Sequence, residues 1–182
     1  MRVFGIDPGS ARTGYGCVES DGSRHRLVSC GAIVMPSRAA LAERLLAIHR
    51  QLGELLAAVH PDCVVVENLF HALHARSALT LGHARGVAIL AAAEAGLPVV
   101  EYTPAEIKRA VVGYGRAEKT QVQQMVTMLL GLAVAPTPLD ATDALAVAIC
   151  HLHRLGPLSR AEASAASGRR QPRSWRQVRI DS

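Results

Sequence analysis

Four carboxylates border apolar segments of the chain, at positions where a purely structural role would favour neutral residues. Asp7 and Glu67 each directly follow a short apolar run, whereas Asp140 and Asp143 directly precede one. Hard divalent cations prefer oxygen ligands, and acids at the ends of strands can converge without burying uncompensated charge. The pattern therefore predicts a divalent-cation site built from these four side chains.

The chemistry of such a site follows from its charge. Carboxylates that converge without cations repel one another, which raises some of their pKa values. Two Mg²⁺ or Mn²⁺ ions about 4 Å apart would neutralise them and activate a water for attack on a phosphodiester. Asp7 could instead begin a turn, and Asp140 could be an acid of the first helical turn. Glu67 is hardest to explain structurally, because a Glu that completes a Val-Val-Val strand gains little from burial.

The first third of the chain is typical of three short strands, at residues 1–7, about 13–19 and about 26–35. Turn residues separate them, at 8–10 and 21–23. Strands joined by such short turns form an antiparallel meander. Asp7 then lies at the end of the first strand.

Helical spacing of apolar residues predicts a first helix from Ser37, as N-cap, to Val59, and a second from Ser77 to about Ala95. The apolar segments 62–67 and 97–102 follow these helices as strands. The first of them is continuously apolar, as expected of a strand covered on both faces. Three further helices are predicted at about 103–112, about 117–130 and 137–155.

This order of elements predicts an α/β fold with a mixed five-stranded sheet, three antiparallel strands followed by parallel ones, flanked by helices. The first strand and the first parallel strand can lie side by side at its centre, which brings Asp7 close to Glu67. Asp140 and Asp143 are three residues apart, so they share a helix face. Pro138 near the helix start places both acids close to the positive end of the helix dipole.

A length of 182 residues fits one domain. Residues 1–150 hold 13 Lys+Arg and 13 Asp+Glu, so the formal net charge of +5 arises in residues 151–182. A basic segment after a neutral domain favours a polyanion partner, and a solvated tail without specific contacts explains it equally well. Ser, Ala, Gly, Pro and Arg dominate from residue 156 on, so we expect a folded domain at 1–155 and a disordered tail at 156–182.

The cellular setting follows from the cysteines and the apolar runs. Cys17, Cys30, Cys63 and Cys150 form no Cys-x-x-Cys pair, which favours reduced core thiols. The N-terminus has no charged segment followed by an apolar one, and no apolar run is long enough to span a membrane. We therefore expect a cytoplasmic protein with no membrane partner.

Several sequence blocks occur in an order that resembles the RuvC family of Holliday-junction resolvases, over residues 1 to about 155. The blocks are Met1-Arg2-Val3-Phe4-Gly5-Ile6-Asp7-Pro8-Gly9-Ser10 with Thr13-Gly14-Tyr15-Gly16, Val65-Val66-Glu67-Asn68-Leu69-Phe70, Ser77-Ala78-Leu79-Thr80-Leu81-Gly82-His83-Ala84-Arg85-Gly86, Val112-Gly113-Tyr114-Gly115-Arg116-Ala117-Glu118-Lys119 and Asp140-Ala141-Thr142-Asp143-Ala144-Leu145-Ala146. The resemblance implies an RNase H-like fold, a homodimer and Mg²⁺- or Mn²⁺-dependent paired nicking of four-way DNA junctions in recombination and repair. It also implies that Asp7, Glu67, Asp140 and Asp143 are the metal ligands, and that junction branch-migration proteins are partners.

Five further residues are candidates for DNA contact. Phe70 follows the acidic strand, and we expect its ring to stack on an unpaired base rather than to anchor a loop. Lys119 aligns with a lysine of the family near the active centre, where it would bind a phosphate or the developing charge. Lys108 is a weaker candidate of the same kind. Arg76 and Arg85 could bind the DNA backbone or a partner subunit.

Two other functions fit parts of the sequence. The glycine-rich segment 7–16 could cradle a phosphate, as in actin-like small-molecule kinases, but this chain is too short for the second domain that such kinases need. A DNA-junction binding module without catalysis is the other alternative. The presence of all four carboxylates argues against it, because an inactive site would have no need of them.

Overall fold

The computed structural model describes residues 1–9, 11–35, 38–68 and 75–155, and for residues 75–76 it describes the backbone alone. The expected tail at 156–182 lies outside the described residues. Five strands form one sheet: β1 (Arg2–Asp7), β2 (Arg12–Ser20), β3 (His25–Val34), β4 (Cys63–Glu67) and β5 (Val99–Tyr102). The helices are α1 (Leu41–Val59), α2 (Ala75–Glu94), α3 (Pro104–Val112), α4 (Lys119–Leu129) and α5 (Leu139–Arg154).

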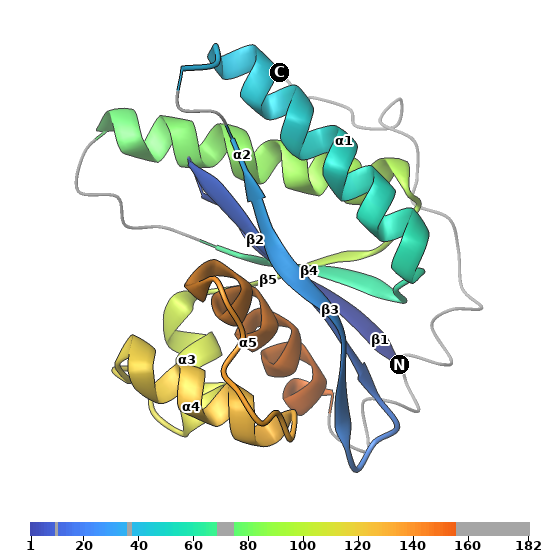
Figure 1. The fold of residues 1–182 in the computed structure, drawn as a ribbon, viewed down its shortest axis with the longest axis vertical. Coiled ribbons are helices and arrows are strands. Elements are labelled where there is room, and N and C mark those ends of the chain that lie inside the picture. Colours follow the sequence, from blue (N-terminus) through green and yellow to red (C-terminus); the bar gives the residue numbers. More distant parts are fainter. Residues whose placement is uncertain (10, 36–37, 69–74, 156–182) are drawn as a thin grey trace, which may run out of the picture.

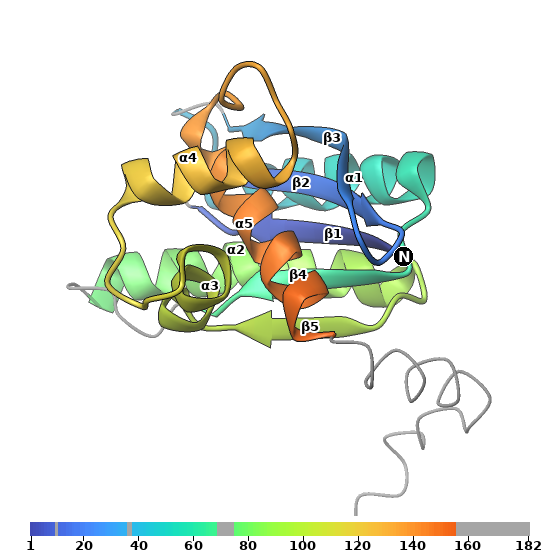
Figure 2. The ribbon, with the colours of Figure 1, turned by 90° about the horizontal axis from the view of Figure 1, so that it is seen from below.

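The sheet has the order β3-β2-β1-β4-β5, which confirms the predicted mixed topology. β1 pairs antiparallel with β2 and parallel with β4, so it occupies the centre of the sheet. α1 and α2 cover one face of the sheet, and α3, α4 and α5 lie on the other (Figures 1 and 2).

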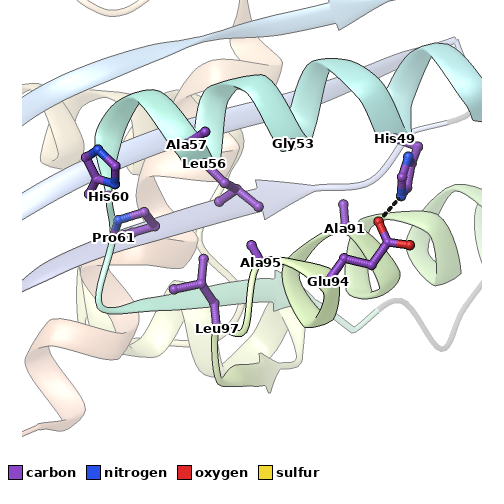
Figure 3. A pocket seen from close by; sticks show the side chains of 10 residues that line it. All are labelled: His49, Gly53, Leu56, Ala57, His60, Pro61, Ala91, Glu94, Ala95 and Leu97. Carbon is purple, nitrogen blue, oxygen red and sulfur yellow. Dashed lines mark hydrogen bonds and ion pairs between the residues drawn. The ribbon is translucent and has the colours of Figure 1, made fainter.

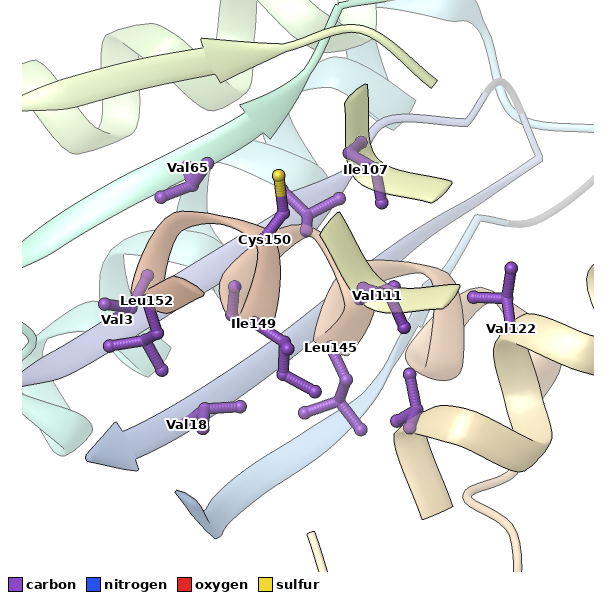
Figure 4. Close-up of a cluster of buried hydrophobic side chains, with 14 of the residues drawn as sticks. Val3, Val18, Val65, Ile107, Val111, Val122, Leu145, Ile149, Cys150 and Leu152 are labelled. Atoms are coloured by element: carbon purple, nitrogen blue, oxygen red, sulfur yellow. The ribbon is translucent and has the colours of Figure 1, made fainter. Parts of the chain in front are cut away.

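Each face of the sheet has its own hydrophobic core, and β1 shows how the strands supply both. Val3 belongs to the core beneath α5, whereas Phe4 and Ile6 belong to the core beneath α1 and α2. This alternation follows from the two-residue period of a strand. The core beneath α5 brings together Val18, Val65, Leu145 and the residues around them (Figure 4). In β4 the whole run 63–66 is buried, because helices cover both faces.

Two glycines allow α5 to lie directly against the sheet. A Cβ atom on Gly5 of β1 would lie 2.1 Å from the carbonyl oxygen of Ala144. A Cβ atom on Gly14 of β2 would lie 2.0 Å from the carbonyl oxygen of Asp140. Glycine inside a strand commonly marks such a close approach of another backbone. The start of α5, with its two acids, is therefore held against the ends of β1 and β2.

The starts of α1 and α2 differ from the predictions. α1 begins at Leu41 with Ala40 as its N-cap, whereas the predicted cap Ser37 lies outside the described residues. The Glu43 carboxylate accepts a 3.1 Å hydrogen bond from the Ala40 N–H, which satisfies a donor that a cap side chain often covers. α2 begins at Ala75, so Ser77 lies inside the helix and is no cap.

The prediction for α3 is confirmed, and α4 begins two residues later than predicted. Thr103 caps α3 and accepts a 3.3 Å hydrogen bond from the Glu106 N–H. α4 begins at Lys119, not near Ala117. All four cysteines are free, and Cys17, Cys63 and Cys150 are buried. Among the described residues, no helix combines the length and the apolar character needed to cross a membrane.

Candidate active site

The central strand pair brings two of the predicted acids together. Ile6 of β1 is the parallel partner of Val66 in β4, so Asp7 and Glu67 end neighbouring strands at the same edge of the sheet. Both side chains contribute to a pocket of about 300 Å³ under α3, α4 and α5. Asp143, Lys108 and Lys119 line the same pocket. The structure thus gathers three of the four predicted metal ligands around one cavity.

Asp140 lies at the margin of this group rather than in the pocket wall. Its carboxylate is paired with Arg12 at 3.9 Å, and its side chain is 35% exposed. It is nevertheless near enough to contribute to the charge around Asp7. Thr142, between the two helix acids, donates a 3.1 Å hydrogen bond to the Pro136 carbonyl oxygen and so pins the first turn of α5.

Burial and mutual repulsion dominate the electrostatics of the two strand acids. Burial, followed by the nearby carboxylate of Glu67, raises the pKa of Asp7 to about 9. Burial also raises the pKa of Glu67, and the charge of Asp143 adds to this, although a hydrogen bond with Asp7 opposes it. Burial and crowding therefore favour the protonated forms of Asp7 and Glu67, as expected of carboxyls placed close together.

Lys119 compensates part of the negative charge in this group of acids. Its ammonium group donates a 3.1 Å hydrogen bond to Asp143, and this contact raises the pKa of Lys119. The side chain of Lys119 is 72% exposed, so it can also meet a ligand that approaches from solvent. Lys108 lies on the other wall of the pocket, where its charge acts on Glu67. Both predicted lysines therefore lie at the acidic cluster.

The donor set fits a hard divalent cation. Every candidate ligand is a carboxylate, and oxygen is the donor that Mg²⁺ and Mn²⁺ prefer. In the described part of the chain, no three acidic or imidazole side chains already surround a common point. In this structure Asp7 bonds to Glu67, and Asp143 bonds to Lys119. Asp7, Glu67 and Asp143 would hold such a cation, whose charge would compensate theirs.

Of the remaining predicted contact residues, the structure describes the side chain of Arg85, which does not line the pocket. Arg85 forms an ion pair with Glu101 on the opposite face of the sheet. Arg76 belongs to α2, but its side chain lies outside the described residues, and so does Phe70.

A second cavity, of about 460 Å³, lies between α1 and α2 and has a different character (Figure 3). Its wall is mainly apolar, with Leu56, Ala91 and Leu97 among its residues. Its polar feature is an ion pair in which His49 and Glu94 are 2.8 Å apart. No converging carboxylates line it, so its larger volume does not make it the better candidate for catalysis.

Sequence patterns gave no indication of the contacts of three polar residues, Arg12, Asn68 and Glu101, which bind one of the acids or lie beside one. Arg12 pairs with Asp140, and Glu101 accepts a 3.4 Å hydrogen bond from Asn68, the residue after Glu67. These contacts join segments far apart in the sequence, so periodicity could not reveal them. Glu101 did carry a signal, because an acid in the short apolar strand Val99–Tyr102 needs a partner.

Comparison with known proteins gives one consistent result. A family model described as "Crossover junction endodeoxyribonuclease RuvC" matches residues 3–151. A protein of that name from Syntrophomonas wolfei is 50% identical over 165 residues, which cover 91% of this chain and 96% of the relative. Another from Chloroflexus aggregans is 50% identical over 160 residues, which cover 88% and 98% of the two chains.

Solved structures agree with this result. The structure titled "T. thermophilus RuvC in complex with Holliday junction substrate" is 36% identical, with a TM-score of 0.83 over 87% of this chain and 97% of that one. The yeast mitochondrial resolvase Ydc2 shares the fold at 13% identity, with a TM-score of 0.64 over 92% of this chain and 84% of that one. The fold is RNase H-like, as the resemblance implied. With a family match across most of its length and relatives at half identity, the chain belongs to the RuvC family of crossover junction endodeoxyribonucleases.

Proposed function

We propose that this protein is a divalent-metal-dependent endonuclease that resolves four-way DNA junctions by paired, symmetric nicks. The observation that carries the proposal is the convergence of Asp7, Glu67 and Asp143 on one pocket, with raised pKa values for the first two. Carboxyls crowded in this way favour the binding of cations. The chain also belongs to a family of crossover junction endodeoxyribonucleases, which supports the proposal.

The residues have separate tasks in this proposal. Asp7, Glu67, Asp140 and Asp143 hold Mg²⁺ or Mn²⁺, with two ions per site. When bound, the cations supply an activated water and stabilise charge on the phosphate. Lys119, exposed and adjacent to Asp143, binds the phosphate that is cut, and Lys108 binds its neighbour on the other wall.

The proposed substrate is a four-way junction, as in the Thermus thermophilus complex named above. Phe70 follows Glu67 by three residues, which supports the proposal that its ring stacks on a base near the cut. Recombination and repair are the processes that this activity would serve, with branch-migration proteins as partners.

The proposed homodimer is supported by the outer face of α2. Leu79 and Leu90 are 65% and 51% exposed on one face of this helix. Between them, Gly82 and Gly86 leave open space around their Cβ positions. A ridge of leucines with glycines between them permits close approach of a second helix. The small residues Ala84, Ala88 and Ala91 of the same helix are buried in the core between this helix and the sheet.

Cleavage of three labelled DNAs tests the proposal. A four-way junction, a linear duplex and a single strand, each of the same sequence, are incubated with the protein in Mg²⁺ or in EDTA. The expected result is nicking of the junction alone, in Mg²⁺ alone, at two symmetric positions. Hydrolysis of ATP without nicking would favour the kinase alternative, and tight junction binding without nicking would favour the non-catalytic module.

A further inference from the structure

A small polar cluster joins β4, β5 and α2 on the face of the sheet opposite the acidic pocket. One carboxylate oxygen of Glu101 is ion-paired with Arg85 of α2, and the other accepts a 3.4 Å hydrogen bond from the side-chain amide of Asn68. The side chains of Arg85 and Glu101 are only 29% and 32% exposed. One acid therefore connects a helix to the end of the strand that carries Glu67.

The strand register places this cluster directly behind the catalytic edge. Glu101 is the parallel partner of Val66, and Tyr102 is the partner of Glu67. The Asn68 N–H donates a 2.8 Å hydrogen bond to the Tyr102 carbonyl oxygen. Asn68 is thus held twice by β5, once through its backbone and once through Glu101. Because Asn68 follows Glu67 immediately, these bonds restrict how the Glu67 backbone can shift.

The ion pair with Arg85 fixes the orientation of Glu101. The Nε atom of Arg85 is buried and has no hydrogen-bond partner among the described residues. Its contact with Glu101 is therefore important to compensate a guanidinium that is mostly removed from water. A carboxylate held by Arg85 on one oxygen can present the other oxygen to Asn68 in a defined position.

We propose that Glu101 is a positioning residue that fixes Glu67 for cation binding, through Asn68 and with Arg85 as its anchor. This inference rests on the proposed function, in which Glu67 is a metal ligand. Groups that orient metal ligands typically change metal affinity or activity by about 10- to 100-fold when they are removed. Glu101 does not touch the pocket itself, so its effect passes through the β4 backbone.

The test compares Glu101→Gln with a matched control, Glu19→Gln. Glu19 pairs with Arg2 at 2.9 Å, with side chains 31% and 32% exposed, at the opposite end of β1 from Asp7. Glu101→Gln loses one Arg–Glu pair, and Glu19→Gln loses two, because Glu19 also pairs with Arg26. The control should therefore lose at least as much thermal stability as Glu101→Gln. Mn²⁺ binding is measured by calorimetric titration without DNA, and hydrogen exchange is followed over residues 63–68.

The expected result is a roughly 10-fold weaker Mn²⁺ affinity and faster exchange over 63–68 in Glu101→Gln, with neither change in Glu19→Gln. Asn68→Ala retains the ion pair with Arg85 but breaks the link to β4, and it should reproduce the loss of affinity. Equal Mn²⁺ affinities in Glu101→Gln and Glu19→Gln would overturn the proposal, and so would wild-type affinity in Asn68→Ala.

The two proposals can fail separately. If the wild-type protein binds no Mn²⁺ and nicks no junction, the proposed function is wrong. The exchange measurement still decides the role of Glu101 in that case. Faster exchange over 63–68 in Glu101→Gln alone supports positioning, and unchanged exchange contradicts it.

Discussion

In the acidic pocket, protonation and the lysine side chains compensate the negative charge of the carboxylates. The stability of the metal-free protein therefore depends on pH. The pKa of Asp7 rises from 3.8 to about 9 on folding. The folded protein therefore holds a proton that the unfolded chain has lost between these values. The contribution of Asp7 to stability is fully present below about pH 3.8 and is lost as the pH rises towards about 9.

This leads to a prediction for Asp7→Asn in EDTA. The variant should lose less stability than the wild type between about pH 5 and about pH 8, because the titrating group is gone. Urea unfolding at both pH values measures the difference. Asp62→Asn is a control at the opposite end of β4, where Asp62 accepts a 2.6 Å hydrogen bond from the Arg2 N–H. Equal pH dependence in the wild type and Asp7→Asn would contradict the assignment of the raised pKa to Asp7.

Cation binding should reverse the same destabilisation. At about pH 8, Mg²⁺ at 100 times its dissociation constant should stabilise the wild type by about 2.7 kcal/mol. Glu67→Gln should show little of this gain, because it loses a charged ligand. Thermal melts with and without Mg²⁺ measure both values, and Na⁺ at matched ionic strength controls for screening. A full gain in Glu67→Gln would exclude that residue as a ligand.

At the scale of elements, the position of α5 on the sheet determines where Asp140 and Asp143 lie. Gly14 permits this contact, since its Cβ position lies 2.0 Å from the Asp140 carbonyl oxygen and 3.1 Å from the Asp140 Cβ atom. Gly14→Ala should push the start of α5 off the sheet and reduce nicking by about 100-fold, because displacements near 1 Å suffice for such losses. Nicking and thermal stability are measured together.

The control for this prediction is Gly53→Ala. Gly53 lies inside α1, and its Cβ position has open space. The substitution should stabilise the protein by about 0.4–1 kcal/mol through helix propensity and the unfolded chain, without a change in nicking. Wild-type nicking in Gly14→Ala would show that the close contact is unnecessary for the site.

Elements that local sequence patterns define could be predicted, whereas contacts between segments far apart in the sequence could not. The strands and their order followed from local apolar patterns, which is why Asp7 and Glu67 could be expected side by side. The start of α2 could not be predicted from Ser77, because the residues before that serine continue the helix. Two ion pairs, Lys119 with Asp143 and Arg12 with Asp140, join segments far apart in the sequence. The spacing of residues could therefore not predict them.

At the scale of the whole molecule, paired nicking requires two sites related by two-fold symmetry. Leu90→Glu should separate the proposed dimer, because it adds a charge to the exposed ridge of α2. Light scattering at micromolar concentration should show a monomer, and nicking should be slow and unpaired. Leu46→Glu on α1 is the control, since Leu46 is similarly exposed at 48%. A Leu90→Glu monomer with full paired nicking would contradict the dimer proposal.

The most direct test of the cation-holding cluster is a single-turnover nicking assay on a four-way junction with charge-neutral variants. The variants are Asp7→Asn, Glu67→Gln, Asp140→Asn and Asp143→Asn, with Asp62→Asn as control. Amides retain the size of the acids but lose the charge that holds Mg²⁺. We expect each of the four to slow nicking on the order of 100-fold or more while junction affinity is largely retained, and the control to cut normally. Nicking at the wild-type rate by any of these four variants would contradict the assignment of that acid.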